Sequence, residues 1–500
     1  MFLWFERFIF VGTWRCKKNA QFIATREGFD LPSCYYFMLM NYKKFLFCSF
    51  ISVFLSACSS DDSSSASAEQ APEKELKAFS NTLLDLTSDQ QTVDEGYWKN
   101  ALSNVWEGIK KRNIEAYGTG LIHRPKSEKP GDAVSEGVGY GMLTAMFAND
   151  QETFNRIWEA GNTYMWSRCY YNWQVNKSGS VIGHGAASDA EEDVALALVF
   201  ADKLVKAGKW KDYSSPKRGS YLEHAKKIMD CMWSTEQITN KGTLAPGAGW
   251  GGEEFVNPGY FSPAWYKIFA KYDSTHNWQK VVDRSYEILS KSVGYPYGLI
   301  PDWMTPSGGS AGSGLGYNSY GDGLYCFKDA IRTLWRIAID AIWFKDTRAK
   351  ALLTNAVTFI NNAGGAPAAN FYKTDGTLIP AEDVWTDMAA GTITRTRREH
   401  SHLTIGMWAT AIAAAGSKED MEAFSTELSK FYEGGDYFGN AVDPLGGTED
   451  TLHNEMYFDQ FLGWFGASML SGSFINVIDA IDNPATPAEK IYTDISYEEK

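Results

Sequence analysis

Twelve segments with helix-like hydrophobic periodicity follow one another between residues 94 and 470, and they constrain the fold more than any other feature. Two stretches, residues 194–201 and 404–415, are apolar or small nearly all round, so each must form a helix that others enclose. A third, 417–432, carries charge on one face and should lie outside. We therefore predict an all-α domain built from two concentric layers of helices. The twelve segments lie near residues 94–112, 135–148, 151–165, 188–206, 219–234, 262–272, 276–291, 327–346, 348–362, 399–415, 417–433 and 452–470.

An apolar run over residues 45–57, preceded by Lys43 and Lys44, is too short to span a bilayer, which takes roughly 20 residues. A segment that begins with basic residues, continues with an apolar stretch and ends with small residues is typical of a secretory signal peptide. The end of the run, LSAC, resembles the bacterial lipobox. That resemblance implies cleavage before Cys58 and attachment of lipid to its sulfur. Ser59 after the cysteine favours the outer membrane as the destination of an exported lipoprotein.

The chain divides into four parts on this interpretation. Residues 1–57 are a signal peptide together with an extension that precedes a natural start at Met38 or Met40. Residues 58–80 form a Ser/Ala/acidic tether, 81–482 form one catalytic domain, and 483–500 form a polar tail. The cysteines left in the domain are odd in number and lack CxxC spacing, so neither a disulfide framework nor a zinc site is indicated. They are Cys169, Cys231 and Cys326.

Net charge limits the class of ligand. Without residues 1–57 the chain has 40 basic and 58 acidic residues, a net charge of −18. Nucleic acid is excluded as a partner because phosphate binding needs a basic surface, and a polyanionic substrate is disfavoured. Aromatic residues make up 15% of the chain. Most of these rings must pack in the core, but such a number also suits grooves that bind sugar rings.

Three acidic residues stand at predicted loop-to-helix junctions: Glu136, Asp189 and Asp329. Glycines follow Glu136 at alternate positions and leave space for a bulky ligand, although a glutamate also suits any helix start. Ser188 and Glu191 have the spacing of a capping box, which is a structural explanation for that pair. The four acids around Asp189 exceed what a cap needs, yet they lack the alternating spacing of a calcium loop.

These sites belong to a series of motifs in one order along the chain. Asp329 is followed three residues later by Arg332, which alone would indicate an ordinary helical ion pair. Together, however, the motifs resemble glycoside hydrolase family 8, and the resemblance covers roughly residues 90–475. Its main stretches are AVSEGVGYGM (133–142), ASDAEEDVALALVFADKL (187–204), GLIPDW (298–303), KDAIRTLWRIAID (328–340) and YFDQFLGWFGASMLSG (457–472).

The resemblance implies an (α/α)6 barrel with a cleft at its loop end and an inverting mechanism. Glu136 matches the family's general acid, and Asp329 matches the general base of its commonest subgroup. Asp189 matches the acid that holds the sugar at the cleavage point, and Tyr260 matches a tyrosine near the attacking water. Three further residues match the family's substrate-binding positions: Trp173, Trp250 and Arg332.

The expected chemistry is consistent with these residue types. Inversion needs one protonated carboxyl and one carboxylate about 6.5–9.5 Å apart, so that a water molecule fits between carboxylate and sugar. A negative charge on Asp189 would help Glu136 to hold its proton. No metal and no organic cofactor is required. Two departures from the family pattern, Glu191 in place of Asp and Lys328 in place of an aromatic residue, put the choice of substrate in doubt rather than the mechanism.

We therefore predict a monomeric, lipid-anchored, inverting endo-β-1,4-glycanase that acts on cellulose or mixed-linkage β-glucan. A xylanase or oligoxylanase is the alternative within the family, followed by a chitosanase. Alternatives of other classes are a surface glycan-binding protein, which would lack the acids, and a polysaccharide lyase, whose polyanionic substrate the charge disfavours.

His400 and His402 fit an ion-paired loop better than a metal site. The glycine-rich residues 308–314 lack the Lys-Ser/Thr of a phosphate loop.

Overall fold

The computed structural model describes residues 83–125, 129–312, 325–326, 329–379, 387–389, 392–394, 400–432, 435–439 and 457–484. These residues belong to one compact unit. The predicted signal peptide, Cys58, the tether and most of the polar tail lie outside the described residues. Among the helices that are described, none has the length and apolar character needed to cross a membrane.

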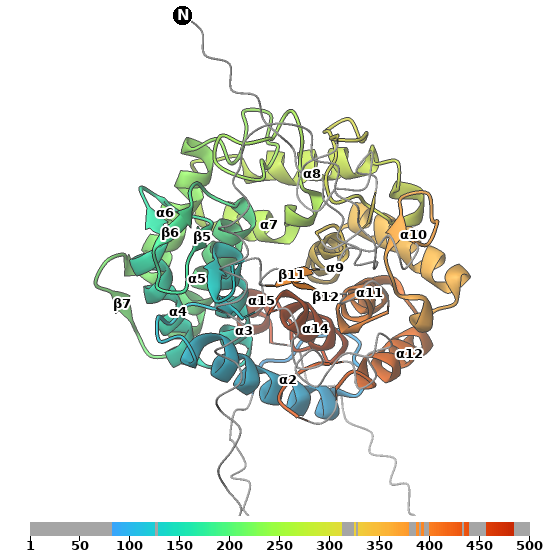
Figure 1. Ribbon diagram of the computed structural model, residues 1–500, viewed down its shortest axis with the longest axis horizontal. Helices are drawn as coiled ribbons and strands as arrows, with labels where there is room; N and C mark the ends of the chain where they lie inside the picture. The colour runs from blue at the N-terminus through green and yellow to red at the C-terminus, as the bar shows by residue number, and fades with distance from the viewer. Residues whose placement is uncertain are drawn as a thin grey trace, which may run out of the picture. The chain divides into compact units, whose positions relative to one another are not determined.

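All twelve predicted helices are present, with ends within a few residues of those expected. Figure 1 shows one set of these helices near the centre and the others around the periphery. The inner helices are α3 (Ser135–Phe147), α5 (Ser188–Lys206), α7 (Pro263–Tyr272), α9 (Arg332–Phe344), α11 (His402–Ala415) and α14 (Tyr457–Leu470). The outer helices are α2 (Glu95–Ile109), α4 (Gln151–Tyr164), α6 (Tyr221–Ser234), α8 (Trp278–Ser290), α10 (Thr347–Ala363) and α12 (Lys418–Ser429).

Burial separates the two layers as the sequence predicts. All 14 residues of α14 are buried, whereas α12 buries only four of its 12. The inner helices α11 and α14 approach so closely that a Cβ on Gly466 would lie 2.4 Å from the Cα of Gly406. Glycine at this crossing therefore permits backbone contact that no larger residue allows. On the other side of α14, Phe465 packs against Tyr140 of α3, with ring centroids 5.3 Å apart.

Side-chain caps fix the beginnings of several helices. Ser220, Ser401 and Ser417 each accept a hydrogen bond from the backbone N–H three residues later and start α6, α11 and α12. The cap at Ser401 also places His400 in the preceding loop, where its ring contacts Glu427 at 3.0 Å. His400 thus lies in a loop beside a carboxylate, as predicted, whereas the loop prediction was wrong for His402, which is the first residue of α11 and is buried. Arg395, Arg397, Arg398 and Glu399 lie outside the described residues.

Short strands add to the helices, so the all-α prediction was incomplete. Four strands form an antiparallel sheet in the order β1-β2-β5-β6, and β2 leads directly into α3. Strands of two or three residues are too short for the alternation by which a sequence predicts them. The sheet strands are β1 (His123–Arg124), β2 (Asp132–Val134), β5 (Gln174–Val175) and β6 (Val181–Gly183).

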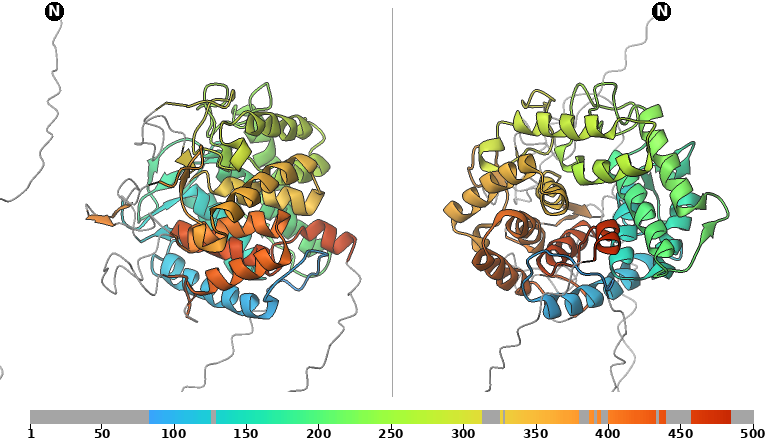
Figure 2. Two further views of the ribbon diagram at one scale, coloured as in Figure 1. Left: turned by 90° about the vertical axis from the view of Figure 1, so that its right-hand side faces the viewer. Right: turned by 180° about the vertical axis from the view of Figure 1, so that it is seen from behind.

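The other short elements connect the helices. Figure 2 shows strands gathered at one end of the helices and α15 at the other. These elements are β3 (Trp166–Ser167), β4 (Tyr170–Tyr171), β7 (Ser214–Ser215), β8 (Gly219–Ser220), β9 (Tyr325–Cys326), β10 (Tyr372–Lys373), β11 (Asp387–Ala389), β12 (Thr392–Thr394), the π-helix η1 (Lys110–Glu115), the 3-10 helices η2 (Pro258–Tyr260), η3 (Tyr295–Tyr297) and η4 (Ala366–Ala368), and α15 (Val477–Asp482).

A disulfide bond joins Cys169, between β3 and β4, to Cys231 in α6. The expectation that the cysteines form no disulfide was therefore wrong. The two residues are 62 positions apart, and packing brings their Cα atoms to 5.8 Å. Their spacing in the sequence carries no sign of this proximity. The bond ties the β3–β4 hairpin, which leads to Trp173, to an outer helix.

Candidate active site

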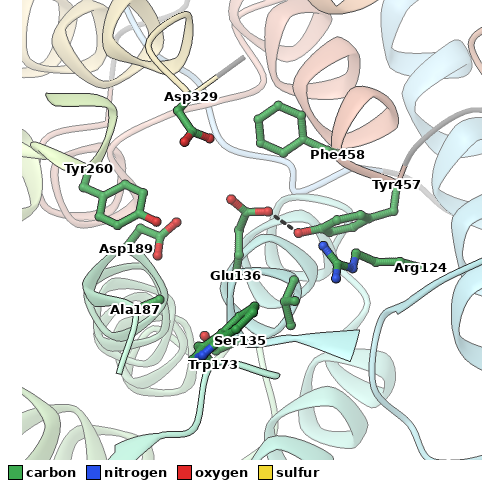
Figure 3. A pocket seen from close by; sticks show the side chains of 11 residues that line it. Arg124, Ser135, Glu136, Trp173, Ala187, Asp189, Tyr260, Asp329, Tyr457 and Phe458 are labelled. Carbon is green, nitrogen blue, oxygen red and sulfur yellow. Dashed lines mark hydrogen bonds between the residues drawn. The ribbon is translucent and has the colours of Figure 1, made fainter. Parts of the chain in front are cut away.

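Five predicted site residues converge on one pocket of about 220 Å³. Glu136 comes from the first turn of α3, Asp189 from the first turn of α5, and Asp329 from the loop before α9. Helix starts from distant parts of the chain thus point to the same place (Figure 3). The pocket is lined by Arg124, Val134, Ser135, Glu136, Trp173, Ala187, Asp189, Tyr260, Asp329, Tyr457 and Phe458.

One guanidinium group joins the three carboxylates. Arg332 Nη1 donates to Glu136 Oε2 at 2.5 Å and to Asp189 Oδ2 at 3.2 Å, while Nη2 donates to Asp329 Oδ1 at 3.2 Å. The predicted ion pair between Asp329 and Arg332 is confirmed, but it is one contact of several. The Arg332 side chain is only 1% exposed and does not line the pocket. The guanidinium group of Arg332 therefore bridges Glu136 and Asp329 and neutralises part of their charge.

Asp189 is the most deeply buried of the three carboxylates. Burial raises its pKa well above the usual value, and the charge of Glu136 raises it further, against the opposing effect of Arg332. Glu136 and Asp189 both accept from the same guanidinium nitrogen. Because of its raised pKa, Asp189 can retain a proton at a pH where an isolated carboxyl group is ionised.

Asp329 and Tyr260 lie on the same side of Glu136, away from Tyr457 (Figure 3). Asn257 Nδ2 lies 3.4 Å from Asp329 Oδ2, and the buried Asp302 accepts the backbone N–H of Ala330 at 2.7 Å. Burial and nearby carboxylates raise the pKa of Tyr260 well above its usual value, so it stays a neutral hydrogen-bonding group. A water molecule on this side would meet a carboxylate and a phenol together.

The four acids at the start of α5 each have a separate buried role. Beyond Asp189, Glu191 accepts the backbone N–H of Tyr171 at 2.8 Å, Glu192 accepts the hydroxyl groups of Ser262 and Tyr266, and Asp193 pairs with Arg336. The capping-box interpretation was wrong, because Ala187 is the cap residue and Ser188 makes no capping bond. Glu191 instead reaches away from its own helix toward the β3–β4 hairpin.

Burial raises the pKa of Glu191 to about 8. Its other oxygen, Oε2, has no hydrogen-bond partner among the described residues. The folded protein therefore favours the protonated form of Glu191. The stability that this form contributes is greatest below the unfolded pKa of about 4.5 and is lost as pH rises through 8. Wild-type stability should accordingly fall between about pH 5 and pH 8.

We predict that Glu191→Gln removes much of this dependence. The amide oxygen keeps the bond to Tyr171, so we expect near wild-type stability at pH 5 and a gain on the order of 3 kcal/mol at pH 9. Urea unfolding across this pH range measures the effect. The exposed Glu152→Gln is the matched control. Parallel stability curves for wild type and Glu191→Gln would contradict the prediction.

Several pocket residues were not assigned by the sequence analysis. Tyr457 donates a hydrogen bond to Glu136 Oε1. Arg124 pairs with the buried Asp132 and lines the pocket close to Tyr457. Tyr457 opens a motif that resembles the family, but the motif alone does not say which of its residues faces the pocket.

Trp250 lies outside the pocket lining. It is 48% exposed and packs edge-on against Trp303, with ring centroids 5.5 Å apart. Its loop is nevertheless close to the pocket, because Pro246 accepts the backbone N–H of Ser188. Its predicted role in substrate binding stays a prediction, whereas Trp173 lies at the pocket itself.

Carboxyl groups that converge on one pocket beside aromatic rings are typical of sites for glycoside hydrolysis. The model of the family described as glycosyl hydrolases family 8 matches residues 73–443. The chain belongs to glycosyl hydrolase family 8.

Two curated relatives are endoglucanases by name. Endoglucanase 2 of Ruminiclostridium josui is 34% identical over 287 residues, which are 56% of this chain and 59% of that protein. Endoglucanase C of Ruminiclostridium cellulolyticum is 32% identical over 322 residues, which are 63% of this chain and 65% of that protein. The chain thus spans less than two thirds of the length of these relatives.

Solved structures share the fold. Rex8A from Paenibacillus barcinonensis, complexed with xylose, matches with a TM-score of 0.58 at 20% identity and covers 77% of this chain and 95% of its own. A β-1,3-1,4-glucanase from Paenibacillus sp. X4 matches with a TM-score of 0.59 at 21% identity and covers 79% and 97%. These likenesses concern the helical architecture.

Proposed function

We propose that the protein is an inverting endo-β-1,4-glycanase that hydrolyses cellulose or mixed-linkage β-glucan. The observation that carries the proposal is the convergence of Glu136 and Asp329 on one pocket, each bonded to Arg332. The similarity to two endoglucanases supports the substrate class. We further propose that the two helical layers form an (α/α)6 barrel, which the contacts among the inner helices support.

In the proposed mechanism, Glu136 gives a proton to the leaving oxygen while Asp329 takes a proton from the attacking water. Tyr260 and Asn257 flank that water, and Asp189 binds the sugar at the cleavage point. Attack from the face opposite the leaving group inverts the anomeric carbon. Arg332 Nη2 donates to Asp329 Oδ1 and so fixes the position of this carboxyl group beside the pocket.

Product analysis of the purified protein on carboxymethyl-cellulose, barley β-glucan, xylan and chitosan tests the substrate. Rapid loss of viscosity on the glucans, with the α-anomer as the first product by NMR, is the expected result. Activity on xylan alone would instead support the xylanase or oligoxylanase alternative. Binding of these glycans without cleavage would favour a surface glycan-binding protein instead.

We also propose that the protein is exported and anchored to the outer membrane through Cys58, and that it acts as a monomer. The disulfide bond supports export, since such bonds persist in oxidising compartments. Cys58→Ala is expected to move the protein from the membrane fraction to the soluble fraction. Membrane association that survives this substitution would contradict the anchor.

A further inference from the structure

We infer that Tyr457 is a positioning residue for the general acid, and that its hydroxyl group identifies Glu136 Oε1 as the oxygen that delivers the proton. The inference rests on the proposed function. It adds a residue from α14 to a reaction otherwise assigned to α3, α5, the start of η2 and the loop before α9.

Tyr457 is well placed for this role. Its side chain lines the pocket although the residue is only 3% exposed, and its hydroxyl group donates to Glu136 Oε1. Figure 3 shows the ring lying beside Glu136, on the side away from Tyr260. Phe461, one turn later in α14, packs against the Tyr457 ring with centroids 5.9 Å apart. The phenol therefore approaches the acid from a fixed direction.

The two oxygens of Glu136 differ in how firmly they are held. Oε2 accepts from Arg332 Nη1, and this guanidinium group is buried and also bonded to Tyr140, Asp189 and Asp329. Releasing Oε2 would disturb all of those contacts. Oε1, by contrast, is held by Tyr457, whose hydroxyl group makes no other hydrogen bond to a described residue. Oε1 is therefore the oxygen that can exchange its partner for the glycosidic oxygen of a substrate.

A phenol suits both protonation states of the acid. It can accept a hydrogen bond from protonated Oε1 and donate one to ionised Oε1. When the O–H bond of Glu136 breaks, the proton passes to the leaving oxygen as the bond from that oxygen to the anomeric carbon breaks. The attacking water forms the new bond to carbon and gives its proton to Asp329. Tyr457 then stabilises the carboxylate left on Glu136.

Comparing Tyr457→Phe on two substrates tests the inference. On a β-glucan oligosaccharide, whose leaving group needs protonation, we expect kcat to fall about 10- to 100-fold through misplacement of the acid. On β-cellobiosyl fluoride, whose leaving group needs no proton, we expect a change of less than about twofold.

Two controls separate positioning from a structural effect. Tyr221→Phe removes a hydroxyl group that bonds Asn155 and Gln151 and does not line the pocket, so it should leave the rates on both substrates unchanged. In a Glu136→Gln background, adding Tyr457→Phe should change the rate less than about twofold, because the Glu136 carboxyl group on which Tyr457 acts is absent. Equal losses on both substrates would overturn the inference. A wild-type protein inactive on both substrates would overturn the proposed function itself.

Discussion

Asp329→Asn is expected to reduce hydrolysis of every glycan substrate about 10³-fold, the usual contribution of a general base. The amide cannot take a proton from water, yet it has nearly the same shape and can still accept from Arg332 Nη2. The loss should therefore appear in kcat, with little change in KM or in melting temperature. Steady-state kinetics on β-glucan, with thermal unfolding of the same samples, measures both. The exposed Glu254→Gln serves as control.

Glu136→Gln is expected to differ from Asp329→Asn in one respect. Loss of the acid should slow cleavage of substrates with poor leaving groups by a similar factor, about 10³-fold, but should spare glycosyl fluorides. Loss of the base should slow both kinds of substrate, since water must be activated in each case. Full activity of either variant on β-glucan would contradict the assigned roles.

Asp193→Ala is expected to cost about 3–5 kcal/mol in the free energy of unfolding, a large part of the stability of a domain. Asp193 and Arg336 form a two-bond ion pair in the core, where their side chains are 1% and 0% exposed. Asp193 Oδ1 also accepts from Trp265 Nε1 at 2.7 Å. Removing the carboxylate leaves a buried guanidinium and an indole N–H without their acceptor. Urea unfolding at neutral pH measures the loss.

A surface ion pair is the matched control for that effect. Glu95 and Lys99 also lie 2.6 Å apart, but both side chains are close to half exposed. Glu95→Ala should cost no more than about 1 kcal/mol, because water solvates the remaining lysine. Similar losses for Asp193→Ala and Glu95→Ala would mean that the buried pair is not the source of stability.

The helices, and the residues that gather at the candidate pocket, were predictable from the sequence. Helical periodicity is a local property that reports which side of a segment is buried, so the twelve helices and the enclosed character of 404–415 could be predicted without contacts. Motifs around Glu136, Asp189 and Asp329 lie at helix starts, where a short stretch of sequence sets both the backbone and the side-chain direction.

Contacts between distant segments were decided only by the tertiary structure. Cys169 and Cys231 pair across 62 residues, and Tyr457 reaches Glu136 across 321. Glu191 has the spacing of a helix cap but bonds Tyr171 instead, because the hairpin packed against α5 offers it a backbone N–H. The sequence by itself determined where helices begin and which acids stand there. Which partner each buried group meets depends on how the helices pack, and that packing has no local signature.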